Sequence, residues 1–331
     1  MTTQREALIR AFLDAAGWGA ARRGRLAGDA SFRHYDRLLL AGRPAVLMDA
    51  PPPQEDVRPF VRIARHLAAL ELSAPRLLAV DEENGLLLLE DLGDGTYTRL
   101  LAEGHDEAAL YGLATDVLAA IAAHPDALCH GVPPYDDPRL LTEANLLPQW
   151  YMPALLGQGT DPQVQAEYEA IWRRLFPIAR MVPETLVLRD FHVDNLMLLD
   201  RPGLAACGLL DFQDAVAGPA TYDLMSLLED ARRDIDPVLI ERMKQRWLAR
   251  FPAIDRAVFE ASWAVMAAQR HAKVIGIFTR LCQRDGKPGY LIHIPRVWRL
   301  LEAALAHPVL AELRVWLDRH IPKASRGVPT P

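Results

Sequence analysis

Apolar side chains recur at helical spacing in two segments near the start of the chain. Four apolar residues between Leu8 and Leu13 fall on one face of a helix over residues 4–16. A proline-rich break follows later, and residues 56–72 again place their apolar side chains on a single helical face. Both segments are therefore predicted to be amphipathic helices that each cover a hydrophobic core.

Runs of apolar residues that are separated by turn-forming residues predict strands around these helices. Residues 31–40 and 45–50 read as a hairpin, and residues 76–81 and 85–92 read as a second strand pair. A small antiparallel sheet and a helix therefore fill about the first 90 residues.

Beyond residue 94 the pattern changes to long helical segments that are interrupted by prolines. The exception is a run of three short strands at residues 185–190, 195–200 and 207–212, the last two joined as a hairpin. The pattern predicts an α+β protein with a sheet-rich part over 1–92 and a mostly helical part over 93–331. We expect disorder from about residue 323, where the tail is polar and proline-rich.

Composition narrows the class of protein. The 331 residues carry a formal net charge of −6, which argues against a partner made of nucleic acid. The three cysteines lie far apart and form no CxxC pair, and no apolar run reaches the ~18 residues of a membrane span. We therefore expect an ordinary enzyme of the cytoplasm, with no membrane partner and no disulfide framework.

The most informative segment is LRDFHVDN at 188–195, which LLDF at 209–212 follows. An Asp, an Asn five residues later, a strand hairpin and a second Asp before Phe form the arrangement that kinases use for the catalytic base and the metal ligands. Asp190 would face the acceptor hydroxyl. Asn195 and Asp211 would supply oxygen ligands to Mg²⁺ beside the phosphates of a nucleotide.

Other interpretations of these residues exist. Loop aspartates commonly cap turns, and the spacing from Asp190 to Asn195 would carry little weight without Asp211 and the hairpin. His192 and Asp194 could also ligate a transition metal for hydrolysis, but that needs further clustered ligands, and the remaining histidines are scattered.

These two segments resemble the signatures of the aminoglycoside phosphotransferase family, the small-molecule branch of the protein-kinase-like fold. The resemblance covers nearly the whole chain and implies a two-lobed fold with a small antiparallel-sheet N-lobe and a larger, mostly helical C-lobe. It also implies ATP and Mg²⁺ as cofactors, Asp190 as the base, and Asn195 and Asp211 as metal ligands. Gly218 and Asp223 match the later part of the signature, where Asp223 is expected to be structural.

The chain departs from the family pattern at three places. Leu188 and Arg189 replace a His-Gly pair and Gln213 replaces a Gly, and we expect neither change to touch a metal ligand. Met48 stands where a kinase strand offers its phosphate-binding Lys. The missing charge must then come from elsewhere, with Arg33 as a candidate beside Arg58 and Arg62.

Further donor contacts are expected in the first lobe. The loop at 28–33 lies where a phosphate-covering loop belongs, so Ser31, Phe32 and Arg33 are candidates for phosphate contacts. Glu90 and Leu92 occupy the link between the predicted lobes, where main-chain groups of kinase-like folds pair with adenine. A plain strand end would look the same in the sequence.

A narrower resemblance concerns the acceptor. Segments 147–151, 268–280 and 284–287, together with the opening GDASFRHYDRL and the absent Lys, are similar to the bacterial anomeric kinases of N-acetylmuramic acid and N-acetylglucosamine. This resemblance implies phosphorylation of the C1 hydroxyl of an amino sugar during cell-wall recycling. We expect a monomer, because no apolar seam is evident.

Four residues of the helical part are candidates for sugar contacts. Trp150 and Tyr151 could stack on the apolar face of a sugar, and Arg270 or Lys273 could pair with the lactyl carboxylate of N-acetylmuramic acid. The alternative is that the aromatic side chains pack between helices and that the two cations line a helix surface.

Two other functions stay open. An aminoglycoside kinase, or a kinase of another small molecule, would keep the same catalytic residues, although the cations near Arg270 suit a polycationic drug poorly. A pseudokinase would explain Met48, but a pure scaffold has no need of Asp190, Asn195 and Asp211 together.

Overall fold

The computed structural model describes residues 3–26 and 32–329, and the chain folds as two compact units. The first unit comprises residues 1–117 and 193–215, and the second comprises 118–192 and 216–331. The sheet of the first unit ends at residue 90, close to the lobe boundary expected at 92. That boundary stays a prediction, because the first compact unit continues to residue 117 and also includes residues 193–215.

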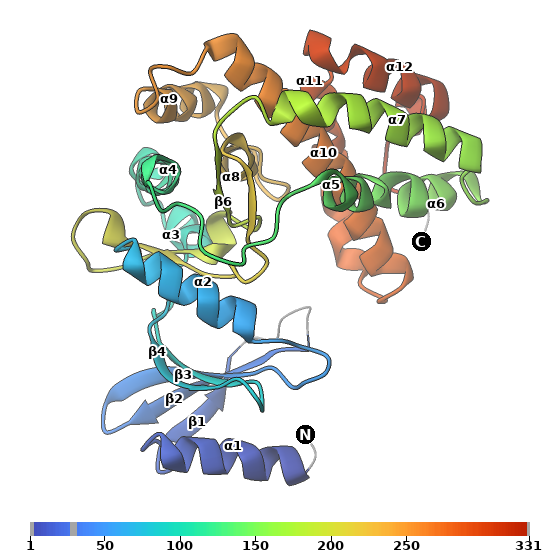
Figure 1. Cartoon of the computed structure of the whole chain (residues 1–331). Helices are drawn as coiled ribbons and strands as arrows, with labels where there is room; N and C mark the ends of the chain where they lie inside the picture. Colours follow the sequence, from blue (N-terminus) through green and yellow to red (C-terminus); the bar gives the residue numbers. More distant parts are fainter. Residues whose placement is uncertain (1–2, 27–31, 330–331) are drawn as a thin grey trace. The chain divides into compact units, whose positions relative to one another are not determined.

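The first unit is built on a five-stranded antiparallel sheet (Figure 1), with strand order β1-β2-β3-β5-β4. Its helices and strands are α1 (Thr3–Ala15), β1 (Arg22–Arg25), β2 (His34–Leu40), β3 (Arg43–Asp49), α2 (Arg58–Ala69), β4 (Leu77–Asp81), β5 (Leu86–Glu90), α3 (Tyr97–Ala102), α4 (Glu107–Ala123), β7 (Leu196–Leu198) and β8 (Cys207–Leu209). Helix α4 continues across residue 117 into the second unit. The expected hairpins and both amphipathic helices are confirmed.

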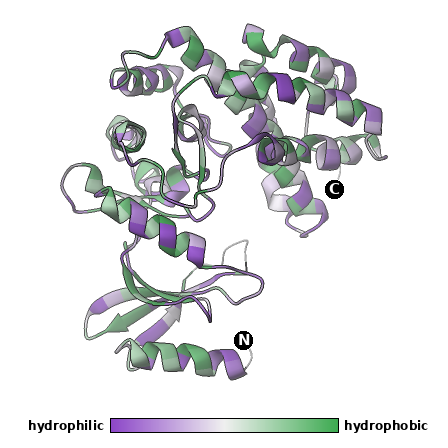
Figure 2. Ribbon diagram, viewed as in Figure 1, coloured by the Kyte–Doolittle hydropathy of each residue, from purple (hydrophilic) through white to green (hydrophobic). Residues whose placement is uncertain are grey.

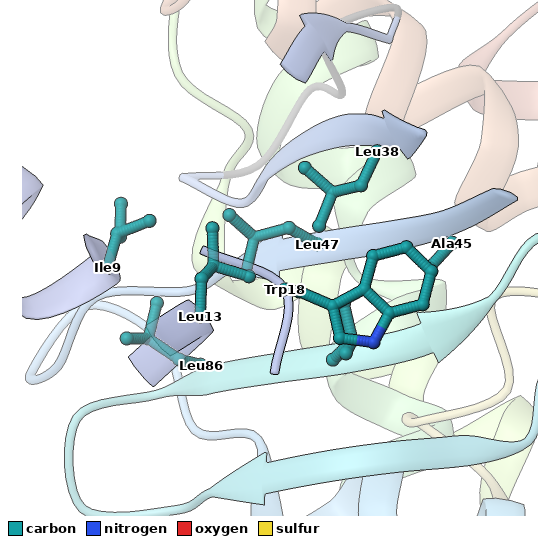
Figure 3. Packing of buried hydrophobic residues seen from close by; sticks show 8 residues of the cluster. Ile9, Leu13, Trp18, Leu38, Ala45, Leu47 and Leu86 are labelled. Atoms are coloured by element: carbon teal, nitrogen blue, oxygen red, sulfur yellow. The ribbon is translucent and has the colours of Figure 1, made fainter. Parts of the chain in front are cut away.

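One face of the sheet carries a hydrophobic core under α1. Ile9 and Leu13 of the helix pack with Trp18 and with apolar side chains of the three central strands, among them Leu38, Leu47 and Leu86 (Figure 3). Since side chains alternate along a strand, the neighbours of Leu47 in β3 point to the other face. Val46 and Met48 therefore belong to the face that α2 adjoins.

Helix α2 forms because proline breaks the chain before it and its apolar positions share one side. Figure 2 shows both hydrophobic and hydrophilic residues along this helix. Its apolar residues Phe60, Val61 and Leu67 are buried, as expected for an amphipathic helix. Pro59 lies in the first turn, where a missing N–H costs nothing.

The second unit is mostly helical and carries one short strand pair, β6 with β9. Its helices and strands are α5 (Asp137–Ala144), a π-helical turn η1 (Leu147–Tyr151), α6 (Met152–Leu156), α7 (Pro162–Ala179), β6 (Glu184–Val187), β9 (Val216–Pro219), α8 (Thr221–Leu228), α9 (Pro237–Leu248), α10 (Arg256–Gln283), α11 (Ile294–Ala304) and α12 (Ala311–His320). No helix in the described ranges is long and apolar enough to cross a bilayer.

Helix α10 is the central element of this unit, and η1, α5, α7, α8 and α11 pack against it. Gly276 permits the closest approach, since a Cβ there would lie 2.3 Å from the carbonyl carbon of Leu146. The backbone of the η1 segment can reach α10 only because residue 276 has no side chain.

The end of the described chain differs from the expected disorder. The Arg326 guanidinium is almost fully buried, with ion pairs to Glu302 at 3.0 Å and Asp318 at 2.6 Å, and it lies over the Trp298 ring. Gly327 hydrogen-bonds the Tyr151 hydroxyl through both its N–H and its carbonyl. Arg326 and Gly327 therefore make contacts with the rest of the unit that the polar composition of the tail does not reveal.

Candidate active site

Asn195 and Asp211 come together in the first unit because β7 and β8 pair as the predicted hairpin. Asn195 directly precedes β7 and Asp211 follows β8, and Asn195 Nδ2 lies 3.4 Å from Asp211 Oδ2. Two oxygens on one octahedral Mg²⁺ lie about 3 Å apart. The two side chains are therefore close enough for a shared Mg²⁺ if the Asn195 amide turns its oxygen, the atom that binds Mg²⁺, toward Asp211 in place of the nitrogen.

Asp211 adopts a strained backbone conformation, with φ of +57°. Non-glycine residues rarely occupy this region, and such residues cluster at functional sites. Gln213 Nε2 donates a hydrogen bond to Asp211 Oδ1 at 2.6 Å. Gln213 therefore contacts the side chain of a predicted metal ligand, a contact that the sequence analysis did not expect.

A cavity of about 490 Å³ in the first unit adjoins these two residues. Val46, Leu89 and Leu92 contribute apolar walls, and Asn195 and Asp211 lie on its lining. Ligand cavities of this size with few polar groups are typical of nucleotide and cofactor sites. The cavity brings Leu92 and Glu90 together with the predicted metal ligands.

The Glu90 carboxylate is held by two arginines, Arg201 at 2.6 Å and Arg76 at 3.2 Å. Although burial raises its pKa, these hydrogen bonds lower the pKa of Glu90 overall. Since the side chain is engaged in this way, it is not free to turn toward a ligand, and a main-chain contact of Glu90 with a ligand in the cavity stays a prediction.

Arg37 is a cavity residue that the sequence analysis missed. Its guanidinium, from β2, pairs with Asp91 at 2.7 Å and Asp94 at 2.9 Å, and it donates to the Gly93 carbonyl. These contacts hold the segment that follows β5 against the sheet. No local pattern marks Arg37, because its partners lie more than 50 residues away.

A smaller cavity of about 210 Å³ lies on the same side of β3, and Arg33, Met48 and Glu55 contribute to its lining. Phe60 lines both cavities, so they adjoin. Phe32 is 66% exposed. Ser31, the other predicted contact in this loop, lies outside the described residues.

In the second unit, the loop that carries Asp190 is held by Asp223. The backbone N–H groups of Leu188 and Arg189 donate to the Asp223 carboxylate at 2.5 and 2.9 Å. Burial raises the pKa of Asp223 to about 7, although the two N–H groups act in the opposite direction. The expectation that Asp223 is structural agrees with this geometry, and Asp190 itself is half-buried.

Glu143 anchors the same loop through its neighbour Arg189. Its carboxylate accepts hydrogen bonds from Arg189 and Tyr135, and it pairs with Lys273 at 2.9 Å. Although burial raises its pKa, Lys273 and Arg189 lower the pKa of Glu143 to about 2. Lys273 is thus paired with Glu143. The sequence analysis, which proposed Lys273 as a sugar contact, did not predict this ion pair.

Arg270, one turn before Lys273 on α10, is 6% exposed, and its Nη1 has no hydrogen-bond partner within the described part of the chain. His192 lies close enough for the charges of Arg270 and Asp190 to act on it. Burial and the nearby cations lower the pKa of His192. A buried guanidinium with a spare donor suits an anionic group on an acceptor.

The two predicted aromatic contacts have different environments. Trp150 is half-exposed at the end of η1. Tyr151 is fully buried, its ring lies 5.5 Å from that of Trp298, and its hydroxyl is bonded to Gly327. A ring enclosed in this way cannot stack on a sugar, so Tyr151 takes the packing role that was the alternative.

The transition-metal site that His192 and Asp194 suggested needs further clustered ligands. Asp194 accepts a hydrogen bond from Thr98 within the first unit, whereas His192 belongs to the second. Across residues 3–26 and 32–329, no group of three or more His, Cys, Asp and Glu side chains is arranged to hold a metal ion.

The antiparallel sheet, the cavity beside it and the paired Asn195 and Asp211, followed along the chain by a mostly helical part, define a protein-kinase-like fold. The chain belongs to the phosphotransferase enzyme family, whose model matches residues 23–261. The family and the fold expected from the sequence are thereby confirmed, and membership implies a nucleotide as phosphate donor.

Relatives and solved structures agree with this assignment. The N-acetylmuramate/N-acetylglucosamine kinase of Caulobacter vibrioides is 39% identical, covering 98% of this chain and 99% of its own. The enzyme of the same name from Pseudomonas aeruginosa is 41% identical, covering 90% of this chain and 89% of its own. A choline/ethanolamine kinase family protein from Mesorhizobium loti has a TM-score of 0.62 at 13% identity, covering 95% of this chain and 99% of its own. The GDP complex of aminoglycoside 2′-phosphotransferase-IIIa has a TM-score of 0.60 at 16% identity, covering 91% and 98%.

Proposed function

We propose that this protein is an ATP- and Mg²⁺-dependent kinase that phosphorylates the C1 hydroxyl of N-acetylmuramic acid, N-acetylglucosamine or both. The observation that carries the proposal is the identity of 39–41%, over nearly the whole chain, with two kinases named for these sugars. The solved structures at 13–16% identity support only the fold. An aminoglycoside or choline acceptor therefore has no comparable support.

Three residues carry the chemistry in this proposal. Asp190 orients the anomeric hydroxyl and accepts its proton as the sugar oxygen bonds to the γ-phosphorus and the bond from that phosphorus to the β,γ-bridging oxygen breaks, so that ADP leaves. Asn195 and Asp211 hold the metal ion, which when bound neutralises charge on the phosphates of the donor. The main chain at Glu90 and Leu92 contacts the base of the nucleotide in the larger cavity.

Arg270 is the main residue that binds the acceptor sugar in this proposal. Arg270 is 6% exposed, and its unpartnered Nη1 is suited to a carboxylate, which N-acetylmuramic acid carries and N-acetylglucosamine does not. Lys273 contributes positive charge from behind Glu143, and half-exposed Trp150 offers an apolar surface. We also propose that the protein acts as a monomer in the cytoplasm, where its nucleotide donor is available.

The test is a panel of acceptors assayed with ATP and Mg²⁺. ADP release is measured with N-acetylmuramic acid, N-acetylglucosamine, kanamycin and choline, and products are examined by phosphorus NMR. An anomeric sugar phosphate is the expected product. Turnover with kanamycin or choline alone would reject the amino-sugar assignment, and nucleotide binding without any turnover would favour the pseudokinase.

A further inference from the structure

Arg33 occupies a position unlike that of an ordinary surface arginine. It directly precedes β2, and its side chain is only 13% exposed. Its Nε lies 3.3 Å from Glu55 Oε2, and its Nη1 lies 3.9 Å from Asp211 Oδ1. The guanidinium therefore stands between a loop carboxylate and a proposed metal ligand, where long charged side chains rarely lie without a specific role.

Strand β3, which lacks the lysine of protein kinases, contributes to the lining of the 210 Å³ cavity together with Arg33. In protein kinases a lysine of the third strand reaches the donor phosphates and is held by a glutamate of the next helix. Here that strand position holds Met48, which is 1% exposed and cannot carry charge. Met48, Arg33 and Glu55 all line the 210 Å³ cavity, so a positive charge is restored to this space from a different element.

Glu55 contacts both the backbone and the side chain of this short segment. One carboxylate oxygen accepts a hydrogen bond from the Phe32 N–H at 3.2 Å, and the other pairs with Arg33 Nε. Glu55 lies between β3 and α2, and its own side chain is 18% exposed. A carboxylate with both oxygens engaged restricts the direction in which the Arg33 guanidinium points.

The two other candidate arginines are placed differently. Arg58 is 69% exposed and pairs with its neighbour Asp56 at 2.8 Å. Arg62 is half-buried, and it is absent from the described linings of both cavities. Of the three arginines, Arg33 lines the 210 Å³ cavity and lies 3.9 Å from Asp211 Oδ1.

We propose that Arg33 and Glu55 together replace the missing lysine and its glutamate. In this arrangement Arg33 binds the terminal phosphates of the nucleotide, and Glu55 is the positioning residue that orients it. The inference rests on the proposed nucleotide-dependent function, and it adds the origin of the positive charge and the residue that directs it.

The first experiment measures the binding of ADP and of adenosine to the full chain by calorimetry, with and without Mg²⁺. Arg33→Ala is expected to weaken ADP binding about 10- to 100-fold, the range for loss of one charged hydrogen-bonding partner. Adenosine binding should stay within about twofold, because adenosine has no phosphate. This second ligand also reports that the variant is folded.

Arg58→Ala serves as the matched control, since it also removes one arginine charge, at a position three residues after Glu55. It is expected to leave the affinity for ADP unchanged. Unchanged ADP affinity in Arg33→Ala, or a loss in Arg58→Ala of the size expected for Arg33→Ala, would overturn the assignment of Arg33.

The role of Glu55 is tested by a double-mutant cycle. Glu55→Gln alone should weaken ADP binding by a few-fold, because the guanidinium loses its orientation, and it should have no further effect in an Arg33→Ala background. Independent, multiplying effects of the two substitutions would refute the positioning role.

This experiment separates the inference from the proposed function. If Arg33 governs ADP affinity while no amino sugar is phosphorylated, the inference stands and the acceptor assignment fails. If an amino sugar is phosphorylated while Arg33→Ala binds ADP normally, the proposed function stands and the inference fails.

Discussion

Replacing Glu143 with Gln is expected to destabilise the second unit in a way that depends on pH. The Glu143 side chain is 12% exposed, and its carboxylate pairs with Lys273 and Arg189, two cations that have little access to water. Removing its charge leaves both cations without their shared counter-ion. Breaking one partner of a buried ion pair costs about 3–5 kcal/mol.

The pKa of Glu143 gives an independent magnitude. Burial opposes the shift, but Lys273 and Arg189 bring the pKa from 4.5 to about 2. At about 1.4 kcal/mol for each pKa unit, the charged form contributes about 3 kcal/mol to the free energy of unfolding at neutral pH. A depressed carboxyl pKa stabilises above the unfolded value of 4.5, and this contribution is lost as the pH falls toward 2. At pH 3.5 about 2 kcal/mol of it should remain.

The assay is urea unfolding followed by tryptophan fluorescence at several pH values between 7 and 3.5. Six of the seven tryptophans lie in the second unit, so the signal reports mainly on that unit. The difference between wild type and Glu143→Gln should shrink from about 3 to about 2 kcal/mol across this range. A difference that does not change with pH would refute the reasoning.

Glu312→Gln is the matched control. Glu312 pairs with Arg174 at 2.6 Å, but both side chains are more than half exposed. Water and salt screen such a pair, so its loss should change the free energy of unfolding by less than about 1 kcal/mol. A control as destabilised as Glu143→Gln would show that burial is not the cause.

Three further substitutions test the site and the core. Asp190→Asn should lower kcat by about 100-fold or more while the Kd for ADP stays near wild type, because it removes the proposed base and leaves the nucleotide cavity intact; undiminished turnover in the sugar-kinase assay would remove Asp190 from the proposed mechanism. Asp211→Ala should weaken Mg²⁺-dependent ADP binding in calorimetry, since one of the two proposed protein ligands is lost; a wild-type titration would contradict its proposed metal role. Gly276→Ala should cost about 1–3 kcal/mol in urea unfolding, since its Cβ would overlap the Leu146 backbone, whereas Gly159→Ala, which meets open space, should cost much less; equal costs would contradict the close approach of the two segments.

Local periodicity was sufficient to predict most of the first unit. The strands expected over 31–40, 45–50, 76–81 and 85–92 correspond to β2, β3, β4 and β5. Each has enough consecutive apolar residues to bury one face, which a hydrophobic pattern detects directly. β1 was missed because Arg22–Arg25 has no apolar residue, and only pairing with β2 at the sheet edge makes it a strand.

The sequence by itself also determined that Asn195 and Asp211 lie close together, because the hairpin of β7 and β8 that joins them forms from neighbouring segments of the chain. The spacing of five residues from Asp190 to Asn195 is likewise read directly from the sequence. Only the tertiary structure decided which charges meet. Glu55 reaches Arg33 and Glu143 reaches Lys273 across 22 and 130 residues, and Tyr151 is enclosed by a tail segment that composition suggested was disordered. Long-range pairing depends on how separate elements pack, and no local pattern of hydrophobic and polar positions records it.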